Sequence, residues 1–185
     1  MCKPEGPTPE QPLTTSSSIG MKHGVYWITK RVALGRFATP ERAAVLQQQS
    51  VTHVLNVGEA ASIITATEFG FAAVRDIPVL DLERIPDATA IEAINLLHEM
   101  LLVPDSRIFI HCVAGQNRSP TILWLYLIAC GMSAEDASVL ITDRSPDSVP
   151  GHSLLVDAAL VEMVQSHGVQ QYQPLSDETI LEPAS

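Results

Sequence analysis

Apolar and polar residues alternate along the chain in two patterns, short apolar runs of strand length and longer stretches with helical spacing. Runs rich in branched and aromatic residues predict strands. These predicted strands cover residues 26–28, 32–35, 53–57, 71–75 and 107–111. Stretches with apolar residues at every third or fourth position predict helices. These predicted helices cover residues 40–49, 60–68, 88–100, 119–130, 134–143 and 153–166.

The order of these elements predicts an α/β fold with a central, mostly parallel sheet flanked by helices. In such folds the functional loops lie at the carboxyl ends of the strands. The apolar strand at residues 107–111 is followed, after a short loop, by the most apolar of the predicted helices, at residues 119–130. The loop between them is therefore the predicted position of functional residues.

This loop carries a thiol and a guanidinium, six positions apart, on either side of a glycine. Its sequence is His111-Cys112-Val113-Ala114-Gly115-Gln116-Asn117-Arg118-Ser119. Gly115 lets the backbone turn its N–H groups inward. Ser119 and Pro120 predict the start of the next helix, whose positive end attracts anions. The loop is therefore predicted to bind a tetrahedral anion and to stabilise a thiolate.

Each residue type in the loop has a chemical use. Cys112 is the candidate nucleophile, and the planar guanidinium of Arg118 can clamp two oxygens of a phosphoryl group. Ser119 can donate its hydroxyl to the sulfur and ease its departure. His111 ends a buried strand, so we expect it to hydrogen-bond the loop backbone rather than to carry a proton. The predicted substrate-binding set is His111, Val113, Ala114, Gly115, Gln116, Asn117 and Arg118.

The loop resembles the signature of the cysteine-dependent protein tyrosine phosphatase superfamily, and within it the small dual-specificity phosphatases. That signature is His-Cys, five residues, Arg and then Ser or Thr, and it is matched by His111, Cys112, Arg118 and Ser119. The similarity extends over residues 24–166. The resemblance implies hydrolysis of phosphomonoesters through a phosphocysteine intermediate, without a metal or another cofactor.

The family uses an aspartic acid from another loop to protonate the leaving oxygen. Asp81 follows the segment at residues 77–80 and precedes Cys112 by 31 residues, which is the register that matches the family best. Asp87 precedes Cys112 by 25 residues and is the alternative, although it also fits as the N-cap of the helix predicted at residues 88–100. Asp76 is a third candidate.

Charge bears on the class of substrate. The chain has a formal net charge of −10, of which the predicted tails carry −1 and −3, leaving −6 on the body. This disfavours nucleic acid and membranes as partners. The resemblance adds that relatives acting on inositol lipids carry basic residues inside the loop, where this chain has neutral ones.

The expected substrate is therefore a phosphorylated protein or peptide, with phosphotyrosine and phosphoserine or phosphothreonine both left open. The alternatives are a phosphatase of inositol phosphates or of RNA 5′-phosphates, and a catalytically inactive phosphate-binding module.

Composition predicts one catalytic domain between two tails. With 185 residues and 46% hydrophobic content, the chain can bury one core. We place the catalytic domain at residues 21–168, a disordered segment rich in Pro, Ser and Thr at residues 1–20, and a flexible tail at residues 169–185. Within that tail, Tyr172 and Leu175 are candidates for docking on the domain.

Other features predict a cytoplasmic protein without a metal site. No apolar run reaches the roughly 18 residues of a membrane span, and the N-terminus lacks a signal-peptide pattern. Three cysteines give no disulfide framework, which favours a reducing compartment, and Cys130 is expected in the core. The five histidines other than His111 are scattered, which disfavours a metal site.

Overall fold

The computed structural model describes residues 24–172 and 182–184. Its five strands form one sheet in the order β1-β2-β5-β3-β4. The strands are β1 Val25–Trp27, β2 Val32–Gly35, β3 His53–Asn56, β4 Ala73–Asp76 and β5 Ile108–His111. Strand β1 is antiparallel to β2, whereas the other pairings are parallel. The predicted α/β fold with a mostly parallel sheet is therefore confirmed.

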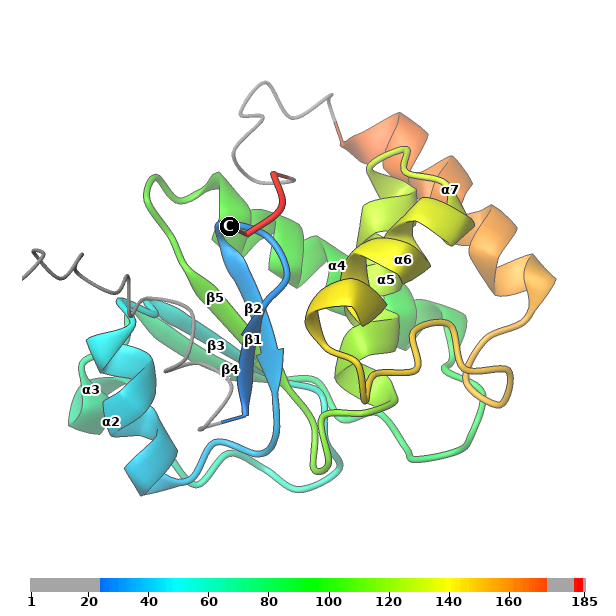
Figure 1. Cartoon of the computed structure of the whole chain (residues 1–185). Helices are drawn as coiled ribbons and strands as arrows, with labels where there is room; N and C mark the ends of the chain where they lie inside the picture. Colours follow the sequence, from blue (N-terminus) through cyan, green and yellow to red (C-terminus); the bar gives the residue numbers. More distant parts are fainter. Residues whose placement is uncertain (1–23, 173–181, 185) are drawn as a thin grey trace, which may run out of the picture.

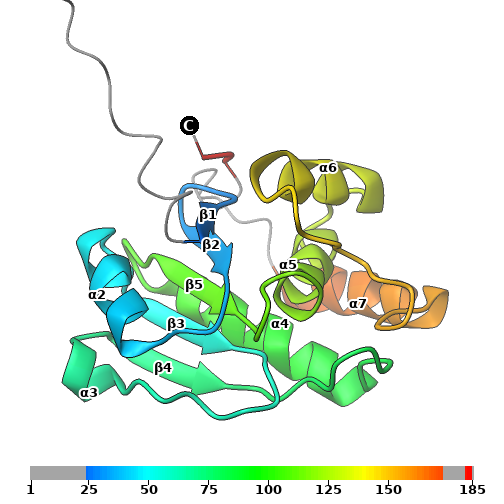
Figure 2. The ribbon, with the colours of Figure 1, turned by 60° about the horizontal axis from the view of Figure 1, so that its bottom comes forward.

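Helices cover both faces of the sheet (Figures 1 and 2). They are α2 Pro40–Gln48, α3 Ala66–Phe69, α4 Asp87–Leu102, α5 Arg118–Ala129, α6 Ala134–Arg144 and α7 Ala158–Gln171. Helices α2 and α3 lie on one face, and the other four gather on the opposite face. Successive side chains of β5 point to opposite faces of the sheet. Phe109 packs in the hydrophobic cluster beneath α2, whereas Ile108 and Ile110 pack in the larger hydrophobic cluster beneath α4 and α5.

Helix α5 is the centre of the larger layer. All of its residues are buried, because α4, α6 and α7 surround it on the sides that the sheet leaves open. Strand β5 lies in the middle of the sheet, between β2 and β3. The short connection from β5 to α5 therefore places Cys112 at the centre of the carboxyl edge of the sheet.

Two predicted elements of the β3–β4 region differ from the structure. The helix expected at residues 60–68 is only the short α3, which Thr65 caps by accepting from the Glu68 N–H and which Gly70 ends in a left-handed conformation. Residues 60–64 stay in a loop, where the Ser62 N–H donates to the Asp76 carboxylate at 2.9 Å. The strand expected at residues 71–75 begins later, at Ala73, because pairing with β3 sets its limits.

Three predicted helix starts were also wrong. Helix α7 begins at Ala158 rather than at residue 153, because Asp157 caps it by accepting from the Leu160 N–H at 2.8 Å. Helix α5 begins at Arg118, one residue before its predicted start at Ser119. Asp87 is not a cap, because it is the first residue of α4, and its carboxylate binds the Arg84 guanidinium at 2.9 Å.

The part of the predicted C-terminal tail that the structure describes contacts the domain. Helix α7 continues to Gln171, and the buried Tyr172 ring stacks on His98 with 4.1 Å between ring centroids. Residues 182–184 lie beside the turn between β1 and β2, where the Lys30 N–H donates to the Glu182 carbonyl at 2.9 Å. Residues 1–20 and Leu175 lie outside the described residues.

Among the residues that the structure describes, no helix combines the length and the apolar character needed to cross a membrane.

Gly168 sets the distance between α7 and α5. A Cβ atom at this position would lie 1.9 Å from the Ala129 carbonyl oxygen. Helix propensity alone favours Ala over Gly by about 1 kcal/mol, but the clash in a packed layer costs more. We therefore expect Gly168→Ala to lower the free energy of unfolding by about 2 kcal/mol, measured by urea denaturation.

The adjacent Val169→Ala is the matched control, because the Val169 side chain is 84% exposed. It should change the free energy of unfolding by less than about 0.5 kcal/mol. An unchanged or increased stability of Gly168→Ala would contradict the close approach of the two helices.

Candidate active site

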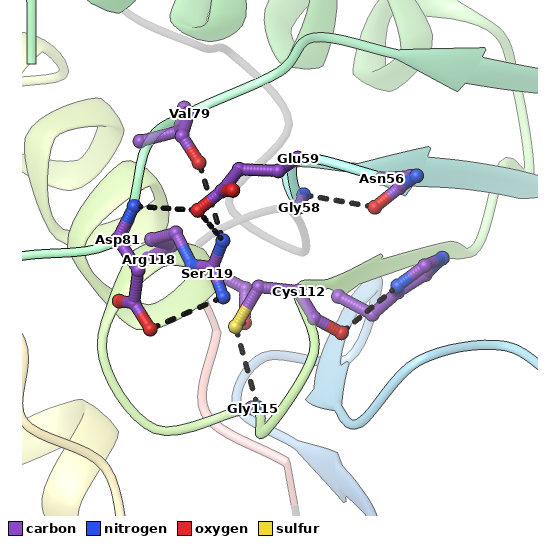
Figure 3. Close-up of polar contacts among 10 residues, drawn as sticks. Asn56, Gly58, Glu59, Val79, Asp81, Cys112, Gly115, Arg118 and Ser119 are labelled. Atoms are coloured by element: carbon purple, nitrogen blue, oxygen red, sulfur yellow. Dashed lines mark hydrogen bonds and ion pairs between the residues drawn. The ribbon is translucent and has the colours of Figure 1, made fainter. Parts of the chain in front are cut away.

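Two hydrogen-bond donors point at the sulfur of Cys112, which is only 1% exposed. The Gly115 N–H donates to Sγ at 3.3 Å, and the Ser119 hydroxyl donates to it at 3.5 Å (Figure 3). Donors directed at one sulfur stabilise its thiolate form. The structure thus brings together Cys112, Gly115 and Ser119 as the sequence predicts, with Ser119 in the first turn of α5.

The β5–α5 loop, residues 112–117, is held against the end of β2. Gly115 has a φ of +74°, and a Cβ atom there would lie 2.7 Å from the Gly35 carbonyl oxygen. The Phe37 N–H donates to the Val113 carbonyl at 3.2 Å. On its other side the loop contacts the α6–α7 loop, residues 145–157, where the Val149 N–H donates to the Gln116 carbonyl at 2.8 Å. The loop conformation is therefore supported from two sides.

The remaining side chains of the β5–α5 loop face outward. Val113, Ala114 and Gln116 are exposed, and Asn117 is half-buried directly before α5 without a capping bond from its side chain. The exposed part of the loop therefore directly follows a buried sulfur.

Arg118 is a buried cation, with 4% of its surface exposed. Its Nη1 donates to the Val79 carbonyl at 3.2 Å and lies 3.4 Å from the Glu59 carboxylate, and its Nη2 lies 3.4 Å from the Asp81 carboxylate (Figure 3). Its buried Nε has no acceptor among the described residues. A buried donor without an acceptor costs free energy, so this N–H favours binding of an anion.

Glu59 is a residue of this site that the sequence did not reveal. It lies in the β3–α3 loop, residues 57–65, and its carboxylate accepts from the Asp81 N–H at 3.0 Å as well as contacting Arg118. One carboxylate thus joins the guanidinium to the β4–α4 loop, residues 77–86. The only signal in the sequence was its position just after a strand of a parallel sheet, where functional side chains gather.

Of the three candidate acids, only the Asp81 carboxylate contacts Arg118. The Asp87 carboxylate binds Arg84 instead. The Asp76 carboxylate accepts from Asn56 Nδ2 and from the Ser62 hydroxyl, both at 2.7 Å. Burial acts to raise the pKa of Asp76, but these hydrogen bonds outweigh it and lower the pKa. Asp76 therefore holds the β3–α3 loop in place rather than facing the sulfur.

His111 is fully buried between two aromatic rings. Its ring centroid lies 5.3 Å from that of Phe37 and 5.6 Å from that of Phe109. Burial lowers the pKa of His111 to about 4, although the hydrogen bond to the Cys112 carbonyl acts to raise it. The neutral ring donates from Nδ1 to that carbonyl at 3.3 Å. This is the backbone contact that the sequence predicts for His111.

The other described cysteine lies at the far end of α5. Burial raises the pKa of the Cys130 thiol to about 11, although a hydrogen bond with Tyr126 acts to lower it. Cys130 packs against the core as expected and is a poor nucleophile at neutral pH.

Solved structures of phosphatases share this fold. The crystal structure of DUSP15 superimposes with a TM-score of 0.62 and 22% sequence identity, covering 79% of this chain and 88% of that one. The crystal structure of PTPMT1 in complex with PI(5)P superimposes with a TM-score of 0.63 and 15% identity, covering 80% of this chain and 96% of that one. At these sequence identities, the similarity shows that the proteins share a fold and no more.

The sequence itself matches known phosphatases. It is 29% identical over 155 residues to dual specificity protein phosphatase 22 of Mus musculus, which covers 83% of this chain and 80% of the relative. Residues 32–162 match the family model described as the dual specificity phosphatase catalytic domain. That span contains β2 to β5, the buried sulfur of Cys112 and the guanidinium beside it. The chain therefore belongs to the dual-specificity phosphatases, a family of cysteine-based phosphatases.

Proposed function

We propose that this protein removes phosphate from phosphorylated protein side chains through a phosphocysteine intermediate on Cys112. The observation that carries the proposal is the buried sulfur with two donors directed at it, next to a buried guanidinium whose Nε–H has no acceptor among the described residues. A phosphoryl group has the charge to use these donors, and phosphorus is a good target for a thiolate.

In the first step, Sγ of Cys112 attacks phosphorus. The S–P bond forms while the P–O ester bond breaks, and the departing oxygen takes a proton from the carboxylic acid of Asp81. Asp81 is our choice for the acid because its carboxylate lies beside the guanidinium that would hold the phosphoryl group. Asp87 and Asp76 are bound elsewhere.

In the second step, water attacks phosphorus and gives a proton to the Asp81 carboxylate. The S–P bond breaks, the sulfur leaves as a thiolate, and inorganic phosphate is released. The Ser119 hydroxyl already donates to this sulfur, so it would stabilise the leaving thiolate.

Substrate binding would fall to the β5–α5 loop and to Arg118. In our proposal, phosphoryl oxygens accept from the backbone N–H groups of residues 113–117 and from the guanidinium, including its Nε–H. His111 supports the loop from below as a neutral ring. Glu59 is a positioning residue, because it contacts both the guanidinium and the backbone of Asp81.

A protein substrate is favoured by charge. The loop residues Val113, Ala114, Gln116 and Asn117 are neutral, and the chain carries a net charge of −10. Both features disfavour polyanionic ligands such as inositol phosphates and RNA, although the related fold of PTPMT1 holds PI(5)P. We also propose a cytoplasmic location, because a thiol nucleophile needs a reducing compartment.

The mechanism predicts that turnover depends on one sulfur. We expect the wild-type protein to hydrolyse para-nitrophenyl phosphate and phosphopeptides, and Cys112→Ser to lower kcat by more than about 10⁴-fold. Cys130→Ser makes the same change at the other described thiol and should retain turnover. Turnover of Cys112→Ser at the wild-type rate would rule out the mechanism. A clear preference for inositol phosphates or 5′-triphosphate RNA would contradict the protein substrate.

The choice of acid is tested by the leaving group. Asp81→Asn should lower kcat about 10²-fold or more for phenyl phosphate, whose leaving oxygen needs a proton. The effect should be smaller for para-nitrophenyl phosphate, because its leaving group is stable as an anion. Asp87→Asn is the matched control and should keep kcat. The reverse pattern would assign the acid to Asp87.

The Glu59 contacts predict a split between kcat and KM. Glu59→Gln removes a negative charge beside the anion site and weakens the hold on Arg118, so both kcat and KM for para-nitrophenyl phosphate should fall, kcat by about tenfold. Glu92→Gln removes the same charge from the exposed surface of α4 and should leave both constants unchanged. A raised KM with an unchanged kcat would show that Glu59 does not position the catalytic groups.

A further inference from the structure

Exposed aliphatic side chains gather on the loops around Cys112. Among the described residues, ten large apolar side chains are at least 44% exposed. Half of them lie in the β4–α4, β5–α5 and α6–α7 loops, and they are Leu80, Leu82, Val113, Val149 and Leu154. We call these five residues the apolar rim. Exposed apolar groups that cluster around a reactive site mark a binding surface.

The three loops that carry the apolar rim meet at the active site. Asp81, between the two leucines, reaches Arg118 at 3.4 Å. Val113 follows Cys112 directly, and the Val149 N–H donates to the β5–α5 loop at 2.8 Å. The α6–α7 loop also joins the β4–α4 loop, since the Ile85 N–H donates to the Leu155 carbonyl at 2.8 Å, next to Leu154.

Leu82 is held in a strained backbone conformation. Its φ of +56° lies in the left-handed region, which bulky side chains rarely adopt and where glycine or asparagine would be relaxed. Its side chain is nevertheless 51% exposed, so the strain does not serve the core. Strain of this kind is typical of functional sites, and here it projects an apolar group beside Asp81.

Acidic side chains accompany the apolar rim. Glu59, Asp81, Glu83 and Asp147 are exposed in the same loops or in the adjoining β3–α3 loop. Three arginines among the described residues lie near these loops. Arg36 follows β2, Arg42 donates to the Phe37 carbonyl, and Arg84 is already paired with Asp87 and Asp157. The surface formed by these loops is therefore apolar and net negative.

We propose that the substrate is a phosphorylated peptide segment with aliphatic residues next to the phosphorylated side chain and basic residues beyond them. The proposal rests on the proposed function and adds a substrate class to it. Aliphatic neighbours would cover the apolar rim, and basic residues would complement the surrounding carboxylates. An anionic lipid surface fits less well, because the same carboxylates would repel it.

Four phosphopeptides with one phosphorylated residue test this proposal. The positions next to the phosphorylated residue are either Leu or Ser, and the positions beyond them are either Lys or Glu. The value of kcat/KM for each peptide is measured by phosphate release. We expect the Leu and Lys peptide to exceed both the Ser and Lys peptide and the Leu and Glu peptide by about fivefold or more. Hydrolysis of para-nitrophenyl phosphate by the same sample reports on the chemistry alone.

Single variants test whether the apolar rim causes the preference for Leu over Ser beside the phosphorylated residue. Leu80→Ser and Leu154→Ser should each lower the ratio of kcat/KM between the Leu and Ser peptides. Leu102→Ser is the matched control, because its side chain is 62% exposed in the last turn of α4, at the opposite edge of the sheet. It should keep the wild-type ratio.

Equal kcat/KM for all four peptides, with para-nitrophenyl phosphate still hydrolysed, would overturn this inference and leave the proposed function standing. Faster turnover of a phosphatidylinositol phosphate in vesicles than of every peptide would overturn it in favour of a lipid. Absence of turnover on every substrate would overturn both the inference and the proposed function.

Discussion

Burial of the Arg118 guanidinium is the constraint on which the site depends. A cation that is removed from water needs acceptors around it, and no single loop supplies them. The acceptors come from Val79, Glu59 and Asp81, so the β3–α3 and β4–α4 loops must converge on the first turn of α5. The same convergence brings the Asp81 carboxylate to the catalytic edge of the sheet. The contacts that satisfy the buried Arg118 guanidinium are therefore the same contacts that assemble the site.

The parts of the site that lie close together in the sequence could be predicted from it. The strand before Cys112, the turn at Gly115 and the helix after it follow from residues within one short stretch, whose local preferences agree with the fold. The sheet could be predicted as well, since its three central strands β2, β5 and β3 are short and buried on both faces, as is typical of parallel strands. Asp81 was selected by its spacing from Cys112 relative to a known family, and the structure places its carboxylate 3.4 Å from Arg118.

The parts that depend on distant segments could not be predicted. Glu59 follows a strand as many solvated acids do, and its contacts with Arg118 and Asp81 exist only once three loops have met. The segment before α7 has residues that suit a helix, yet Leu155 is fixed by the Ile85 N–H from another loop. The helix predicted at residues 60–68 failed for the same reason, because Ser62 bonds Asp76 at the end of another strand. In each case a long-range hydrogen bond outweighed local propensity.

The close approach of Gly115 to Gly35 limits how the proposed anion site could adapt to a larger ligand. Because the Gly35 carbonyl occupies the space that a Cβ atom of Gly115 would need, the β5–α5 loop packs there backbone against backbone and has little freedom to move. The Glu59 and Asp81 side chains, which contact Arg118, are by contrast 52% and 45% exposed. For the proposed function, an inhibitor with an oxyanion larger than phosphate should therefore extend toward these carboxylates rather than toward Gly115, and its added bulk should carry groups that carboxylates can bind.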